Sequence, residues 1–174
     1  MKPLLFALLV VAPVLAPPVL AAPAHQHGVA LLDVAVEPGR VTLELDTPLD
    51  NLLGFEHAPR TDAERERAAA VVAKLNAAED LFRIDSAAGC KLAKATLVSA
   101  LLALGATPAE KDGHGDLQGR FEFNCRVGGR AGFVEVGLFD AFPALKRIEL
   151  QVATPKGQLK AALVKPASRV ALVR

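Results

Sequence analysis

The sequence VALLDVAVEPGRVTLEL, residues 29–45, decides the fold. It predicts two strands, Val29 to Val36 and Val41 to Leu45, joined by a turn over Glu37 to Arg40. Proline followed by glycine suits the central pair of a type II turn. The second strand alternates, which indicates an antiparallel sheet with one buried face and one solvated face; its apolar side holds Val41, Leu43 and Leu45.

A long helix is predicted after this hairpin. Thr61 and Glu64 have the spacing of a capping box. Apolar residues then recur at helical intervals, namely Val71 or Val72, Leu75, Ala78 and Phe82. We interpret the opposite, charged side of this helix as a solvated surface; it carries Arg65, Arg67, Lys74 and Asp80.

The rest of the chain predicts strands. They are expected over Lys91 to Leu101, Gly119 to Arg126, Gly132 to Phe139, Lys146 to Thr154 and Gln158 to Val164, with a hairpin turn at 154–157 and a loop at 104–117. About seven strands around one main α-helix predict an α+β class, with a mostly antiparallel β-sheet in a single domain.

The first 24 residues have the pattern of a cleaved signal peptide. Lys2 precedes an uncharged apolar run from Leu4 to Leu20, and small residues follow at Ala22 and Ala24. An uncleaved membrane anchor is the alternative, but the run is short for a spanning helix and contains three prolines. We therefore expect an exported, periplasmic domain over residues 25–174 without a membrane anchor. Cleavage after Ala22 is the other option.

The charge balance excludes some partners. The chain holds 20 Lys and Arg against 19 Asp and Glu, and Lys2 is the one charged residue of the predicted leader. The expected mature domain is thus neutral and has no basic run. Nucleic acid and anionic lipid both require a basic face, so we expect neither as the main partner.

The two cysteines predict a disulfide. An exported protein with two cysteines usually joins them, and no C-x-x-C pair suggests a thiolate metal site. Cys90 begins one predicted strand and Cys125 ends another, on the face of Phe121 and Phe123. In the chain-entropy model a loop of this length contributes about 3 to 4 kcal/mol.

A search for catalytic motifs finds none. The sequence lacks a G-x-S-x-G elbow, an H-E-x-x-H motif, a phosphate-binding loop and a dinucleotide fingerprint. Carboxylate pairs such as Asp46 and Asp50 are common in turns, and the sequence fixes no separation between them. We therefore expect no enzymatic activity.

The histidines are more informative. His25 and His27 follow the predicted cleavage point, and either cut places a histidine third from a free amine. An amine, backbone amides and such an imidazole suit square-planar Cu(II) or Ni(II), whereas zinc would use both imidazoles with carboxylates. The simple alternative is a polar, fraying terminus.

Two further positions are compatible with metal ligands. His57 follows Glu56 at the end of an apolar segment, although a histidine bonded to a nearby backbone carbonyl is commoner. His114 and Asp116 lie in a loop whose glycines would let the backbone fold around an ion. A solvated loop is the equal alternative there.

The order of these segments resembles a known family. The segments HQHGVA (25–30), DNLLGFEHAP (50–59), AGC (88–90), FEFNC (121–125) and LFDAFP (138–143) look like the periplasmic zinc-binding ZrgA-like family, and Leu52 to Pro59 is the most specific. The resemblance implies a zinc-binding accessory protein of zinc acquisition, working beside a zinc transporter. His25, His27 and His57 match the family pattern, so we expect a site at His25 and His27, completed by His57 or by a carboxylate such as Glu56.

One segment departs from that family. Its members carry a loop rich in His, Asp and Glu before the Phe-x-Phe-x-Cys strand, where this chain keeps His114 with Asp112 and Asp116. This argues against high-capacity zinc buffering. The alternative function is an envelope interaction module without metal, in which residues 138–145 would form an exposed apolar patch. Ordinary core is the simpler interpretation of those residues.

Overall fold

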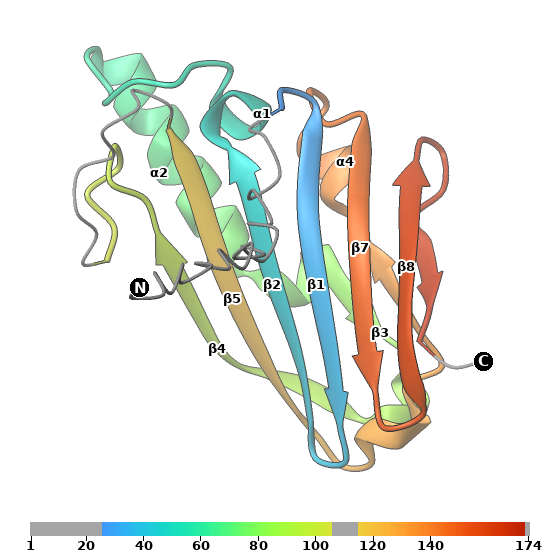
Figure 1. Ribbon diagram of the computed structural model, residues 1–174. Helices are drawn as coiled ribbons and strands as arrows, with labels where there is room; N and C mark the ends of the chain where they lie inside the picture. The colour runs from blue at the N-terminus through green and yellow to red at the C-terminus, as the bar shows by residue number, and fades with distance from the viewer. Residues whose placement is uncertain (1–25, 106–114, 173–174) are drawn as a thin grey trace, which may run out of the picture.

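The computed structural model describes residues 26–105 and 115–172 (Figure 1). The predicted leader, His25, Asp112 and His114 lie outside the described residues. The described chain forms two sheets and four α-helices, and most strand pairs are antiparallel. The predicted single-domain α+β class is confirmed, with nine strands in the described chain in place of about seven.

Six strands form the main sheet: β1 (Val29–Glu37), β2 (Arg40–Pro48), β4 (Cys90–Val98), β5 (Asp116–Cys125), β7 (Arg147–Thr154) and β8 (Gly157–Val164). Their order is β4-β5-β2-β1-β7-β8, as Figure 1 shows. Adjacent strands are antiparallel except β1 and β7, which are parallel. The sequence predicts a loop at Leu117, but this residue continues the buried alternation of β5 that includes Phe121 and Phe123.

The predicted hairpin between β1 and β2 forms, with Glu37 paired to Arg40. Its turn differs from the prediction, because Gly39 lacks the positive φ of a type II turn. The carbonyl groups of Pro38 and Gly39 accept hydrogen bonds from the N–H groups of Gly128 and Cys125, at 2.7 and 2.9 Å. Tertiary hydrogen bonds therefore hold this turn.

A second, three-stranded sheet was not predicted. It contains β3 (Phe82–Ile84), β6 (Phe133–Val136) and β9 (Arg169–Ala171), in the order β3-β6-β9. Strands of three residues are too short to show a period in sequence. The predicted strand from Gly132 to Phe139 is shorter than expected, since Gly137 ends it and α4 (Leu138–Ala141) follows.

The other helices are α1 (Leu49–Leu53), α2 (Asp62–Asn76) and α3 (Ala78–Leu81). Both hydrogen bonds of the predicted capping box are present at the start of α2, between Thr61 and Glu64. The predicted helix is nevertheless too long, because Ala77 interrupts it and Phe82 already belongs to β3. Its expected solvated side is confirmed, with exposed residues Arg65, Arg67, Lys74 and Asp80.

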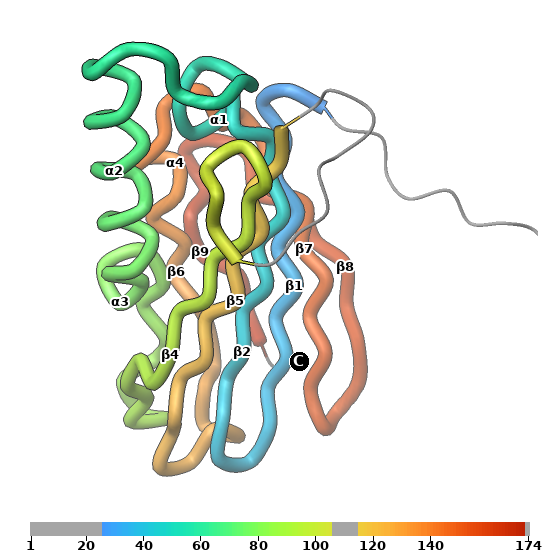
Figure 2. Tube along the Cα trace, turned by 90° about the vertical axis from the view of Figure 1, so that its left-hand side faces the viewer, coloured from blue at the N-terminus to red at the C-terminus, as the bar shows by residue number. Residues whose placement is uncertain are grey.

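The core lies between the main sheet and the layer of helices and short strands (Figure 2). The largest side chains in it are fully buried, and the ring centroids of Phe82 and Phe121 lie 5.1 Å apart. The opposite face of the main sheet is covered by no helix or strand of residues 26–105 and 115–172. Alternation along each strand therefore leaves one polar face open to solvent.

The apolar residues that suggested a docking patch belong to this core. Leu138, Phe139, Phe142 and Leu145 are 0%, 7%, 3% and 0% exposed. The core interpretation is confirmed, and these residues form no exposed patch.

The predicted disulfide between Cys90 and Cys125 is present. The two residues are direct partners at the shared end of β4 and β5. Both are partly buried against the core, so Cys125 is less enclosed than its neighbours Phe121 and Phe123.

Within the described part of the chain, no helix has the length and apolar character needed to cross a membrane.

Candidate metal site

The buried side chain of Asn51 fixes the segment that carries His27. Its Oδ1 atom accepts a hydrogen bond from the Gly28 N–H at 2.6 Å, and its Nδ2 donates to the carbonyl of Val29 at 2.8 Å. Nδ2 also donates to Thr47 Oγ1 at 3.0 Å, and Asn51 is 2% exposed. Figure 1 shows α1 and the start of β1 at the same end of the sheet. Asn51 thus joins the chain beside His27 to the helix that carries Asp50.

The imidazole of His27 lies between two carboxylates. Its Nε2 atom is 3.0 Å from Glu56 Oε1, and its Nδ1 atom is 3.5 Å from Asp50 Oδ2. The Glu56 side chain is 16% exposed, whereas that of His27 is 58% exposed. One carboxylate therefore faces each ring nitrogen, and the ring itself is open to solvent.

This geometry fits the donor set of zinc. Zinc bonds of about 2.0 to 2.2 Å in a tetrahedron place two ligand atoms about 3.3 to 3.5 Å apart. The Nε2 of His27 and the Oε1 of Glu56 are within a few tenths of an ångström of that separation. A histidine ligand usually donates its other N–H to a carboxylate, which fixes the ring. Asp50 is in the position to accept that hydrogen bond.

His57 has different neighbours. Its ring stacks on Phe55, with centroids 4.8 Å apart, and its Nδ1 lies 3.0 Å from the carbonyl oxygen of Ala58. Its Nε2 lies 4.0 Å from Oε1 of Glu64, the capping residue of α2. Hydrogen bonds from the N–H groups of Arg60 and Thr61 lower the pKa of Glu64. The described contacts of His57 are therefore with Phe55, Ala58 and Glu64, close to the start of α2, and none is with His27.

The remaining candidates are placed only in part. His25 and His114 lie outside the described residues. Asp116 pairs with Pro48 across β5 and β2, and the carbonyl of Gly115 accepts a hydrogen bond from Leu49 N–H at 2.8 Å. The end of the loop that contains His114 therefore lies beside the start of α1. Within residues 26–105 and 115–172, no three His, Cys, Asp or Glu side chains form a group that could hold a metal ion.

Sequence reasoning did not assign Asp50 and Asn51 to this site. The adjacent pair begins the segment DNLLGFEHAP, but only the fold shows that one side chain faces His27 and the other is buried. A buried asparagine near the start of a helix leaves no periodic signal in sequence.

A comparison with protein families decides the family of the chain. The model of the ZrgA family of zinc uptake proteins matches residues 24–172. The chain belongs to the ZrgA family. This confirms the resemblance drawn from the five sequence segments, and it relates the chain to zinc uptake. No curated protein matches this ZrgA-family chain significantly.

Proposed function

We propose that this protein binds zinc in the periplasm and delivers it to a component of a zinc transporter, without catalysing a reaction. The family supports the link to zinc uptake. The observation that supports a site is the 3.0 Å approach of His27 Nε2 to Glu56 Oε1, with Asp50 behind the ring. In this proposal the predicted leader exports the chain and is then removed.

His27 and Glu56 supply two of the four ligands that zinc takes. His25 is two residues from His27 and is our candidate for the third ligand. A water molecule would complete the tetrahedron and leave one exchangeable position. An exchangeable position suits a protein that releases its metal to another binding site.

The neighbourhood of His27 favours zinc over the square-planar alternatives. Copper(II) or nickel(II) at a free N-terminus would use the imidazole together with backbone amides of the same residues. The Nδ1 atom of His27 faces Asp50, and Nε2 faces Glu56. These carboxylates orient the ring for a site made of side chains.

Zinc titration calorimetry of the chain beginning at residue 25 tests the proposal. We expect one equivalent of zinc to bind, and the change His27→Ala to weaken binding by at least about tenfold, as loss of a ligand should. His57→Ala is the matched control, since it removes an imidazole whose contacts lie at the α2 end. Equal affinities for the wild type and His27→Ala would overturn the assignment of the site.

A further inference from the structure

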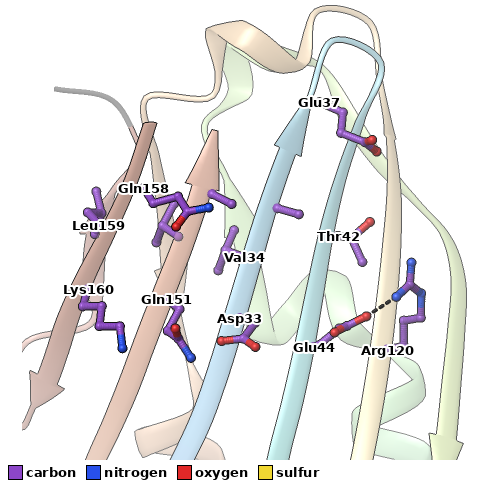
Figure 3. A pocket seen from close by; sticks show the side chains of 13 residues that line it. Asp33, Val34, Glu37, Thr42, Glu44, Arg120, Gln151, Gln158, Leu159 and Lys160 are labelled. Carbon is purple, nitrogen blue, oxygen red and sulfur yellow. Dashed lines mark hydrogen bonds and ion pairs between the residues drawn. The ribbon is translucent and has the colours of Figure 1, made fainter. Parts of the chain in front are cut away.

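One row of polar side chains crosses the open face of the main sheet. Strand register places five residues directly beside one another on adjacent strands: Lys160, Gln151, Asp33, Glu44 and Arg120. Figure 3 shows these side chains side by side across the strands. Two carboxylates therefore occupy the centre of the row, and a basic residue lies at each end.

The neighbouring row has small residues at its centre, between Gln158 and Glu122, and creates a hollow. Ala153, Ala35 and Thr42 are direct partners across β7, β1 and β2. The long side chains of the polar row border them on one side, and Glu37 lies on the other (Figure 3). The resulting hollow has a volume of about 460 Å³, which is within the range of small-molecule sites.

The charges in this hollow are incompletely paired. Arg120 forms ion pairs with Glu44 and Glu122, whereas Asp33 and Lys160 form none with any described residue. Burial raises the pKa of Asp33, and the charge of Glu44 raises it further, against a smaller effect of Lys160. Like charges directly opposite each other on adjacent strands are unfavourable. A cationic group beside Asp33 and Glu44 would remove that repulsion.

Thr42 adds a hydroxyl group to the lining of the hollow. It is 7% exposed and lines the hollow, yet its hydroxyl makes no hydrogen bond to any described residue. The hydroxyl oxygen itself is not fully buried, so solvent reaches it from the hollow. The hydroxyl of Thr42 is therefore available to a molecule in the hollow.

We propose that this hollow binds a small zwitterion whose ammonium and carboxylate groups are separated by a short chain, as in an ω-amino acid or a short peptide. The ammonium group has three N–H donors, and Asp33, Glu44 and Thr42 offer acceptors for them. Lys160 binds the carboxylate, two strands from Asp33 and thus about 10 Å away between strand axes. The Gln151 amide lies between them and hydrogen-bonds a polar group in the middle of the ligand.

This site is distinct from the zinc site. A strand rises about 3.3 Å per residue, so Asp33 lies about 17 Å along β1 from Gly28, toward the hairpin turn. A metal ion fits the hollow less well, since among the described residues no group of three ligating side chains is present. The proposal therefore holds whether or not His27 binds zinc.

Titration of the wild-type mature chain with four probes, followed by NMR, tests the proposal. The probes are 6-aminohexanoate, trialanine, hexylamine and hexanoate. We expect at least one of the two zwitterions to bind in the hollow, and the two single-charge analogues to bind at least about tenfold more weakly, because each lacks one charged hydrogen-bonding end. Tighter binding of trialanine would identify a peptide as the ligand, and tighter binding of 6-aminohexanoate an ω-amino acid.

Three variants locate the binding. Asp33→Asn and Lys160→Gln should each weaken zwitterion binding by about tenfold or more, and Thr42→Val should weaken it with little change in shape. Lys156→Gln, in the exposed turn of the same β7–β8 hairpin, is the matched control and should leave binding unchanged. The absence of binding by either zwitterion, or equal affinities for wild type and Asp33→Asn, would overturn the proposal.

Discussion

The Oδ1 atom of Asn51 accepts a hydrogen bond of 2.6 Å from the backbone N–H of Gly28, 23 residues earlier in the chain. Gly28 directly follows His27, and Asn51 directly follows Asp50. Together with the hydrogen bond from Asn51 Nδ2 to the Val29 carbonyl, the bond to Gly28 holds together the two segments whose side chains meet 3.5 Å apart at the candidate zinc site.

Replacing Asn51 by leucine should affect both stability and zinc binding. The change leaves the buried Gly28 N–H without its acceptor and removes both donated hydrogen bonds. We expect a loss of about 2 to 4 kcal/mol of unfolding free energy in urea, since unsatisfied buried groups cost about 1 to 3 kcal/mol each. Zinc affinity of the folded variant should also fall. Asn76→Leu, at an exposed position, should leave zinc affinity unchanged.

Asp50→Asn should weaken zinc binding without unfolding the protein. The carboxylate orients the His27 ring in our proposal, and loss of such a partner typically lowers metal affinity about 10- to 100-fold. Titration calorimetry measures the change, and Asp80→Asn on the surface of α3 serves as the control. Zinc affinity equal to that of the wild type would show that Asp50 does not act through His27.

Glu64→Gln should destabilise the fold at neutral pH but not in acid. Hydrogen bonds from the N–H groups of Arg60 and Thr61 lower the pKa of Glu64 below its usual 4.5. The ionised carboxylate thus stabilises the fold above pH 4.5, and this contribution disappears as pH falls through the folded pKa. Thermal unfolding at several pH values should show a lower Tm for the variant at pH 7 and a difference that vanishes at low pH. Glu66→Gln, exposed on the same helix, is the comparison.

Asp33→Asn should stabilise the fold at neutral pH, which is the opposite of the effect expected for Glu64→Gln. Burial and the neighbouring charge of Glu44 raise the pKa of Asp33 above 3.8. The folded state then binds more protons than the unfolded state just above pH 3.8, so ionised Asp33 opposes folding at higher pH. The variant should have a higher Tm than the wild type at pH 7, and the two should converge below pH 3.8. A lower Tm for Asp33→Asn at pH 7 would contradict this account.

Loss of the disulfide should destabilise the domain by about 2 to 5 kcal/mol. The bond joins directly opposed residues of β4 and β5 over a separation of 35 residues. Urea unfolding of the variant with both Cys90→Ser and Cys125→Ser measures the loss. Reduction of the wild type should give the same unfolding midpoint as this variant. Rapid reaction of both thiols in the native, non-reduced protein would exclude the bond.

Several elements were predictable because their signals are local. The alternation of Val41, Leu43 and Leu45 predicted a half-buried strand, and the spacing of Thr61 and Glu64 predicted the start of α2. The pairing of Cys90 with Cys125 followed from the presence of two cysteines in a chain expected to be exported. The strand and the helix start depend on interactions between residues close in sequence, and the disulfide followed from the number of cysteines.

The sequence by itself determined the α+β class, the hairpin, the main helix and the family. Only the tertiary structure decided which side chains meet. It placed Asp50 and Glu56 on opposite nitrogens of His27, and His57 against Phe55. It also aligned Asp33 with Glu44 through strand register. Secondary structure depends on the periods of neighbouring residues. Contacts between distant segments instead depend on how the strands are ordered and on the register in which they pair, and no local pattern encodes either.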